Sequence, residues 1–456
     1  MQRIELLPLV LDNQTFFQNC PDIIPRIIPF SPCLDGSEVN FICGSLHTGK
    51  TSFLRQVAGS LQGLKVYINF EDSRFRDLKP ETLQEIKKIA AEYCIKGPED
   101  EEGLAGKEID DKERPEVPVS YFLDEIHCLP EWEDRVYSLQ NDGARVFVTS
   151  SSAGIISDEI SSRFADGIKI IRLLPFSFKE YLTLKGLRVP RPNFLTPSRC
   201  DEMLCLFLQY FENGGFPEII KSGDFRLSRK YFEETLQKEI IERHAIQNPD
   251  GLKKLAVFLI SNMASEYSID TLKRAGGIKD EATVRNYLDY LEEAFLLYRV
   301  PMFRHKSEKP DYGKEGEDER ESNTPCKVYA GDTGFFKSVF PRYPDSLGLR
   351  FENLVFLELL RRGKQVYYLH NRRECDFLIA EKESQKITAA VQVCLCFGGT
   401  AVREREVLGL MEAMEELGLN EGLILTMDDE EVMEIEGRDG ENKRIIINSV
   451  WKWMLE

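Results

Sequence analysis

Several common patterns are missing from this 456-residue sequence. None of the eleven cysteines forms a CxxC pair, so zinc knuckles are unsupported. No run of about twenty apolar residues occurs, and the first residues lack the basic-then-apolar layout of a signal peptide. The sequence therefore predicts no membrane partner, a cytoplasmic location and free thiols rather than disulfides.

Positive charge is also scarce, because 59 Lys and Arg stand against 77 Asp and Glu and the formal net charge is -18. Such a chain repels polyanions as a whole, so any contact with nucleic acid requires a local basic patch. Two acidic stretches, 98–116 and 305–325, are expected to be solvated loops. The length is enough for two or three domains, each with its own core.

Four regions differ in hydrophobic pattern. Over residues 36–190 the apolar runs VNFICG, KVYINF, SYFLDE and RVFVTS alternate with helical patterns, which predicts an α/β fold with a parallel sheet and crossover helices. Residues 191–325 are mainly helical by pattern, either an all-α module or a winged helix, and mixed α/β character returns over 326–456. Residues 1–35, with several prolines and sparse periodicity, are expected to form an irregular lead-in.

The most specific motif is GSLHTGKT at residues 44–51, which matches GxxxxGK[ST], follows an apolar strand and precedes a helical run. Glycines at both ends let the backbone turn so that successive N–H groups face phosphates at a helix N-terminus. Lys50 is expected to reach the β- and γ-phosphates, and Thr51 to ligate Mg²⁺. The nucleotide cradle then comprises Gly44, Ser45, Leu46, His47, Thr48, Gly49, Lys50 and Thr51. ATP is favoured over GTP because the sequence has no NKxD motif.

A second motif supports the first. The run SYFLDE ends an apolar strand in Asp124 and Glu125. Downstream of a phosphate-binding loop (P-loop) such as residues 44–51, such an aspartate is expected to hold Mg²⁺, and the glutamate to orient and deprotonate the attacking water. The strand RVFVTS ends in Ser150, which could sense the γ-phosphate, although ordinary helix capping by serine is the alternative.

The segments FLDEIHCLPEWEDRVYSL, VFVTSSSAGIISDEISSRF and LLPFSFKEYL closely resemble a prokaryotic family of uncharacterised AAA-type ATPases. Later segments, including KVYAGDTGF, RFENLVFLELLRR and ECDFLIA, resemble the same family, so the resemblance covers nearly the whole chain. It implies an AAA-like P-loop core, then a winged-helix region, then a C-terminal domain related to the restriction-endonuclease fold. It also supports the nucleotide and magnesium roles given above.

The sequence departs from this family at one catalytic position. The family usually has an arginine where this chain has Gly167, shortly before the LPFSF segment. Such an arginine would stabilise charge in the transition state, so its loss favours slow or partner-dependent turnover. Arg163 lies close in sequence and is a candidate substitute, with an ordinary surface ion pair as the alternative.

The C-terminal domain has a weakened version of the nuclease motif. By resemblance the site positions are Glu352, Asp376, Gln392 and Cys394. Nucleases of this fold need carboxylates to hold magnesium and usually a lysine near the attacking water. Where an active enzyme would have Glu-x-Lys this chain has QVC, which predicts an inactive or strongly altered nuclease. Lys364 and Lys386 are alternative sources of the missing ammonium.

Residues 268–293 have the helix, glycine-containing turn and second helix of a helix-turn-helix. Its candidate phosphate contacts are Lys273, Arg274, Lys279 and Arg285. Acidic residues interleave with them, so packing or protein contact is the alternative to DNA binding.

Taken together, the sequence predicts a Mg²⁺-dependent ATP hydrolase that acts as a switch or motor, coupled to DNA, to a protein partner or to further copies of itself. The alternative is a nucleotide-gated binding module with negligible turnover. An ATP-regulated nuclease is a third hypothesis, which the QVC sequence disfavours.

Overall fold

The computed structural model describes residues 3–19, 23–28, 30, 38–75, 82–95, 118–154, 164, 167–304, 325–339, 347–382, 384–438 and 440–456. The chain forms two compact units, Met1–Leu173 and Leu174–Glu456. The first unit therefore ends before residue 190, the position at which the sequence predicts the end of the α/β domain. Residues 98–116, most of 305–325 and Arg163 lie outside the described residues.

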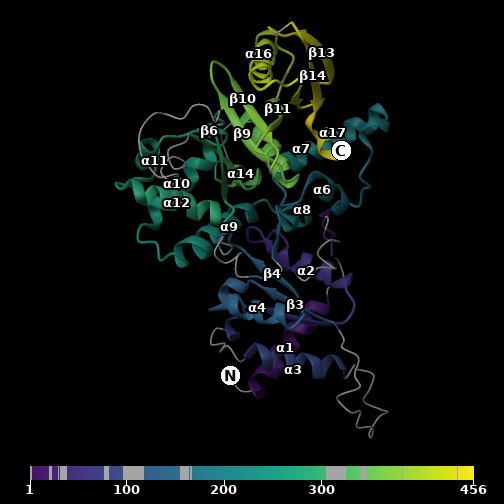
Figure 1. Cartoon of the computed structure of the whole chain (residues 1–456), viewed down its shortest axis with the longest axis vertical. Helices are drawn as coiled ribbons and strands as arrows, with labels where there is room; N and C mark the ends of the chain where they lie inside the picture. The colour runs from purple at the N-terminus through teal and green to yellow at the C-terminus, as the bar shows by residue number, and fades with distance from the viewer. Residues whose placement is uncertain are drawn as a thin grey trace. The chain divides into compact units, whose positions relative to one another are not determined.

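The first unit alternates strands with helices (Figure 1). In chain order its elements are α1 (Arg3–Gln18), β1 (Val39–Cys43), α2 (Lys50–Gly59), β2 (Leu64–Asn69), η2 (Ser73–Phe75), α3 (Thr82–Ile95), β3 (Val119–Asp124), η4 (Ile126–Cys128), α4 (Trp132–Asn141), β4 (Arg145–Ser150) and β5 (Ile168–Arg172). The strands form one parallel sheet in the order β2-β3-β4-β1-β5. The predicted parallel sheet is confirmed, and its first four strands are the apolar runs seen in the sequence.

Helices cover both faces of this sheet. Successive residues of a strand point to opposite faces, so each strand has apolar side chains that pack on both sides. On β1, Ile42 belongs to a buried cluster that includes Phe53 and Leu54 of α2. The neighbouring Phe41 packs against Trp132 of α4, with ring centroids 5.4 Å apart. Strands buried on both faces must be almost wholly apolar, which is why their sequences read as continuous hydrophobic runs.

The irregular lead-in expected at the N-terminus is wrong for residues 3–18, which form helix α1. This helix packs on β2 and α3. Its Phe17 stacks on Tyr67 of β2, with ring centroids 4.3 Å apart. Tertiary packing therefore stabilises a helix whose own sequence pattern is weak.

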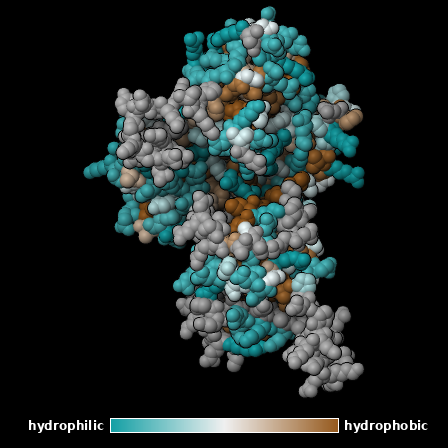
Figure 2. Space-filling view, viewed as in Figure 1, coloured by the Kyte–Doolittle hydropathy of each residue, from teal (hydrophilic) through white to brown (hydrophobic). Residues whose placement is uncertain are grey.

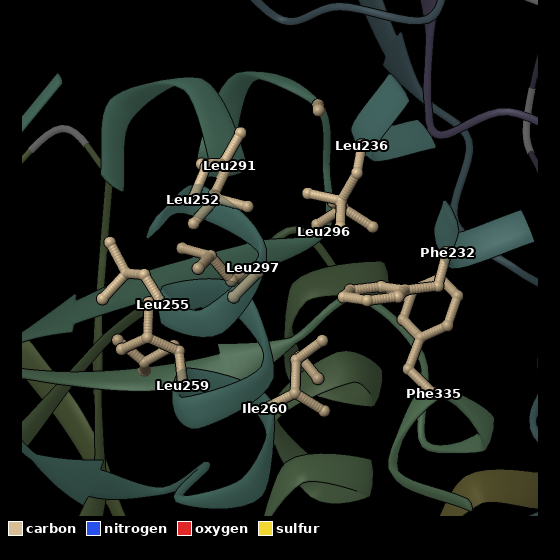
Figure 3. Packing of buried hydrophobic residues seen from close by; sticks show 14 of the residues in the cluster. Phe232, Leu236, Leu252, Leu255, Leu259, Ile260, Leu291, Leu296, Leu297 and Phe335 are labelled. Carbon is tan, nitrogen blue, oxygen red and sulfur yellow. The ribbon is translucent and has the colours of Figure 1, made fainter. Parts of the chain in front are cut away.

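The second unit begins with helices and a small sheet. Its first elements are α6 (Phe178–Leu184), η5 (Pro192–Phe194), α7 (Pro197–Asn213), α8 (Pro217–Ser222), α9 (Arg226–Thr235), the π-helical η6 (Leu236–Glu242), α10 (Pro249–Ser261), β6 (Ser265–Glu266), α11 (Ile269–Gly276), α12 (Glu281–Glu293), β7 (Leu297–Pro301), β8 (Cys326–Ala330) and α14 (Gly334–Val339). Strands β6, β8 and β7 pair antiparallel in that order. Leucines of α10, α12 and β7 meet Phe232 and Phe335 in one buried core (Figure 3).

The rest of the second unit is a six-stranded sheet with flanking helices. Its elements are α15 (Leu347–Arg361), β9 (Gln365–His370), β10 (Glu374–Ala380), β11 (Ile387–Cys394), α16 (Thr400–Leu417), β12 (Glu421–Thr426), β13 (Glu431–Glu436), β14 (Asn442–Ser449) and α17 (Val450–Leu455). The strand order is β13-β14-β12-β11-β10-β9. Strands β11, β12 and β14 are parallel and the other pairs antiparallel. This confirms the mixed α/β character predicted for the C-terminal region.

Among the coloured residues on the face seen in Figure 2, hydrophilic residues predominate, with smaller hydrophobic patches between them. Within the described part of the chain, no helix combines the length and apolar character needed to cross a membrane.

Candidate nucleotide-binding site

The P-loop connects β1 to α2, as the motif predicts, and both of its glycines have a structural reason. Gly49 has a φ of 90°, a left-handed conformation that side chains disfavour. At Gly44 an added Cβ would lie 2.2 Å from the carbonyl oxygen of Leu173. Any larger residue at either position would therefore distort the loop.

Internal hydrogen bonds hold the P-loop in this shape. The hydroxyl of Thr48 donates to the carbonyl of Ser45 at 2.9 Å. The buried Arg26 donates from Nη1 to the carbonyl of Thr48 at 2.9 Å, and its backbone N–H donates to Gln56 of α2. Within the same loop, His47 has a left-handed backbone conformation, with a φ of 64°. Residues before β1 thus form part of the wall behind the phosphate cradle, which the sequence did not suggest.

Lys50 is buried at the start of α2. Its ammonium donates to the carbonyls of Gly44 and Ser45, at 3.1 and 3.2 Å. It also lies 3.0 Å from Oε1 of Glu125. The lysine therefore points into the loop and bridges the two sequence motifs.

Asp124 ends β3 and accepts hydrogen bonds from three hydroxyls. The donors are Thr51 of α2, Tyr67 of β2 at 2.9 Å, and Thr149 of β4. Burial raises the pKa of Asp124, and so does the neighbouring Glu125, while the three hydroxyl donors act against that rise. Tyr67 was not foreseen, because the pattern KVYINF marks it only as a core residue of a strand.

Glu125 adopts a left-handed backbone conformation with a φ of 49°. Its Oε2 accepts from the backbone N–H of Ser151 at 3.0 Å and lies 3.4 Å from Nδ1 of His127. Burial alone would raise the pKa of Glu125, but the Lys50 ammonium, together with His127 and these hydrogen bonds, holds it below its usual value. Glu125 is therefore an ionised carboxylate in a water-poor setting.

Strand β4 brings these groups together because it pairs with both β1 and β3. Its Thr149 hydroxyl donates to Asp124 and accepts from the N–H of Glu125 at 2.9 Å. The hydroxyl of the next residue, Ser150, donates to the carbonyl of Ser152 and accepts from its N–H, both at 3.0 Å. The contacts of Ser150 thus close a local turn, and its role toward the γ-phosphate stays a prediction.

The donor set fits a nucleotide with magnesium. A hard cation prefers oxygen ligands, and the Thr51 hydroxyl and Asp124 carboxylate lie side by side. The Lys50 ammonium and the N-terminus of α2 supply positive charge beside them.

Of the four positions predicted for a nuclease site in the C-terminal region, Glu352, Asp376 and Gln392 lie close together, and Cys394 lines the same pocket. Glu352 of α15, Asp376 of β10, and Gln392 and Cys394 of β11 line a pocket of about 910 Å³. The N–H of Asp376 donates to Oε1 of Gln392 at 3.3 Å. Among the described residues, the lysine that reaches these carboxylates is Lys327 of β8, rather than Lys364 or Lys386.

The predicted helix-turn-helix corresponds to α11 and α12. Two of its basic side chains already face carboxylates. Arg285 pairs with Glu281 at 2.7 Å, and Lys273 lies 4.0 Å from Asp270.

Comparison with known families matches an AAA domain over residues 36–182 and a domain of unknown function over residues 205–346. An uncharacterised protein of Methanocaldococcus jannaschii is 30% identical over 467 aligned positions, which cover 98% of this chain and 94% of that protein. An uncharacterised protein of Haemophilus influenzae is 25% identical, covering 73% of this chain and 76% of that protein.

Solved structures are more distant. A Walker-type ATPase of Pyrococcus abyssi has a TM-score of 0.41 at 13% identity, covering 71% of this chain and 99% of that one. RuvB of Thermotoga maritima has a TM-score of 0.27 at 18% identity, covering 58% of this chain and 82% of that one.

The parallel sheet, the P-loop between β1 and α2, and the matching family model together define an AAA-type P-loop NTPase domain. Since the likeness to the archaeal protein extends over nearly all of both chains, this chain belongs to the same protein family as that relative.

Proposed function

We propose that the chain is a Mg²⁺-dependent ATP hydrolase that works as a switch or motor. The observation that carries this proposal is the convergence of Lys50 and Thr51, at the start of α2, with Asp124 and Glu125, at the end of β3, at one edge of the sheet. A parallel sheet alone would not require these side chains to meet, whereas nucleotide hydrolysis does.

Each residue has a role that its contacts support. Lys50 binds the β- and γ-phosphates after leaving Glu125. Asp124 and Thr51 would hold Mg²⁺, which neutralises phosphate charge when bound. Glu125 orients a water molecule and accepts its proton as the oxygen attacks the γ-phosphorus, while the bond from that phosphorus to the β,γ-bridging oxygen breaks and ADP leaves. This role requires the ionised carboxylate described above.

The alternative is a nucleotide-gated binding module with negligible turnover. It is favoured by Gly167, which stands where the resembling family has an arginine, and its φ of 86° suits glycine rather than an arginine side chain. Without a cationic group to stabilise the transition state, hydrolysis would be slow until a partner or another copy supplied one.

The second unit would couple the nucleotide state to a partner. The order α10, β6, α11, α12, β7, β8 with a three-stranded antiparallel sheet supports a winged-helix reading, and DNA is its candidate partner. The order α15, β9, β10, β11, α16, β12 supports a restriction-endonuclease-like reading for the C-terminal sheet. Nuclease activity is disfavoured there by Gln392 and Cys394.

Steady-state ATP hydrolysis by wild type, Lys50→Ala and Glu125→Gln tests the proposal, with and without single-stranded and duplex DNA. Lys169→Ala and Glu133→Gln are matched controls, because they remove the same chemical groups from β5 and α4. Loss of activity in the two site variants alone supports the ATPase. Tight ATP binding without turnover under every condition supports the binding module, and no nucleotide binding at all would overturn both.

A further inference from the structure

The acidic pocket of the second unit contains a buried lysine that the sequence motif did not identify. Lys327 lies on β8, in a different sheet from Asp376 of β10 and Gln392 of β11, and its side chain is 3% exposed. Its ammonium lies 2.9 Å from Oε1 of Glu352 and 3.9 Å from Oδ1 of Asp376, and it also pairs with Glu374. Three carboxylates thus gather around one cation.

The surroundings fix these groups in place. Tyr329, two residues along β8, donates its hydroxyl hydrogen to Oε1 of Glu352 at 2.7 Å. Oδ2 of Asp376 accepts from the N–H of Val393 at 2.8 Å. The cluster is therefore an organised buried network rather than a set of surface ion pairs.

Charge in this network is balanced by the lysine. Burial by itself lowers the pKa of Lys327, but Glu352, Asp376 and Glu374 outweigh it and hold the pKa above the usual value. Burial also raises the pKa of Asp376, and the neighbouring Glu352 adds to that rise. Lys327 is thus held as a cation among these carboxylates.

A divalent metal does not fit this arrangement. Magnesium requires several oxygen ligands at about 2.0–2.1 Å in near-octahedral geometry. Here the carboxylates point at an ammonium group, and Gln392 turns its amide nitrogen toward Glu406 at 2.6 Å. Among the described residues, no group of three or more His, Cys, Asp or Glu side chains is arranged to hold a metal ion.

We propose that Lys327 is a built-in cation that takes the place of the divalent metal implied by the resemblance to restriction endonucleases, so that the C-terminal pocket holds no metal and cleaves no phosphodiester. The lysine that the QVC motif lacks at Cys394 is not replaced by a lysine elsewhere on β11. An ammonium from another strand instead supplies the positive charge that a metal would bring, and it stabilises the pocket without activating water.

Manganese binding to the nucleotide-free full chain tests this proposal. Bound Mn²⁺ is measured from the electron paramagnetic resonance signal of the free ion, in wild type, Asp376→Asn, Lys327→Met and Lys327→Met/Asp376→Asn. Any ion held by the P-loop domain is common to all four and cancels. Wild type and Asp376→Asn should bind equal amounts. Lys327→Met should gain roughly one Mn²⁺ per chain, because its carboxylates lose their cation, and the double variant should lose that gain.

Lys452→Met is the matched control, because Lys452 pairs with the single carboxylate of Glu430 and its loss should create no metal site. Added Mn²⁺ should also raise the unfolding temperature of Lys327→Met while leaving that of wild type unchanged. If a folded Lys327→Met gains no Mn²⁺, the lysine does not occupy a cation position and the proposal is wrong.

Wild type alone keeps the proposal falsifiable should Lys327→Met fail to fold. Supercoiled plasmid incubated with wild type and Mn²⁺ should stay intact. Cleavage that disappears in Asp376→Asn, or wild-type Mn²⁺ binding that disappears in the same variant, would identify a working metal site and overturn the inference.

Discussion

The ammonium nitrogen of Lys50 lies 3.0 Å from Oε1 of Glu125, so the P-loop lysine and the proposed general base form one buried ion pair. The same lysine donates to two P-loop carbonyls, Gly44 and Ser45. Under the proposed function, phosphate oxygens would have to displace the Glu125 carboxylate before the lysine could bind them. The carboxylate would then compete with the nucleotide for one cation, and nucleotide binding would release the carboxylate.

Glu125→Gln should bind ATP more tightly than wild type while losing turnover. The amide keeps the shape of the side chain but removes the negative charge that competes for Lys50, so affinity for a non-hydrolysable ATP analogue should rise about fivefold, equivalent to about 1 kcal/mol. The kcat should fall by about 10²-fold or more, because no carboxylate remains to accept the proton. Calorimetric titration and steady-state kinetics measure the two effects. Unchanged or weaker binding in Glu125→Gln would argue against competition within the ion pair.

Tyr67→Phe should raise the concentration of magnesium that hydrolysis requires. The substitution removes one of the three hydroxyls that donate to Asp124, and with it a contribution that keeps this carboxylate ionised. We expect the half-saturating Mg²⁺ concentration to rise about threefold and stability to fall by about 1–2 kcal/mol. Mg²⁺ titrations of the ATPase rate at saturating ATP measure the first effect.

Tyr121→Phe provides the control for this experiment. Tyr121 is equally buried on the neighbouring strand β3, but its hydroxyl has no hydrogen-bond partner among the residues that the structure describes. Loss of that hydroxyl should leave the magnesium dependence unchanged and cost no stability, because an unsatisfied buried polar group is removed. Equal effects in both variants would mean that Tyr67 acts only through packing.

The core of the site was predictable from sequence because its residues belong to contiguous motifs. Lys50, Thr51, Asp124 and Glu125 each follow an apolar strand, and parallel strands bring their carboxyl ends to one edge of a sheet. Tyr67 and Arg26 contact Asp124 and the P-loop carbonyl of Thr48, respectively, through contacts between distant segments. Their side chains look like ordinary strand or loop residues until the sheet order is known.

The fold was predictable to a similar extent. Strand β5 was missed because Lys169 and Arg172 interrupt its apolar pattern, and four of its five residues, all except Ile171, are only partly buried or exposed. Lys327 was missed because it lies on β8, far in sequence from the carboxylates that it contacts. Neither feature has a local signal, since both depend on which strand lies next to which.

Phe17→Ala should impair hydrolysis from outside the P-loop. Phe17 of α1 stacks on Tyr67 and is itself buried, so truncation leaves a cavity beside the residue that donates to Asp124. We expect a loss of about 3–5 kcal/mol in stability and a raised Mg²⁺ requirement like that of Tyr67→Phe. Phe16→Ala is the control, because Phe16 is 55% exposed and its ring lies farther from that of Tyr67, with centroids 6.2 Å apart. A folded Phe17→Ala with wild-type magnesium dependence would show that α1 does not position Tyr67.

A buried carboxylate in the second unit should make stability depend on pH. Asp332 accepts hydrogen bonds from the N–H groups of Gly215 and Gly334, both at 2.8 Å. Gly214 leaves room for it, since an added Cβ there would lie 1.9 Å from Oδ1 of Asp332. Burial raises the pKa of Asp332 from 3.8 to about 6, against the effect of the two hydrogen bonds.

Because the folded state binds this proton more tightly than the unfolded state, Asp332 contributes stability that is fully present below pH 3.8 and is lost as pH rises through about 6. The difference between the pKa values of Asp332 in the folded and unfolded states corresponds to at most about 3 kcal/mol of unfolding free energy. Asp332→Asn should be less stable at every pH, because its amide nitrogen would face a backbone donor, yet it should lack this pH-dependent component. Between about pH 4 and 6.5, the thermal unfolding midpoint of wild type should therefore fall relative to that of Asp332→Asn as the pH rises. Parallel curves for the two proteins would mean that Asp332 is ionised throughout and that its two backbone hydrogen bonds outweigh burial.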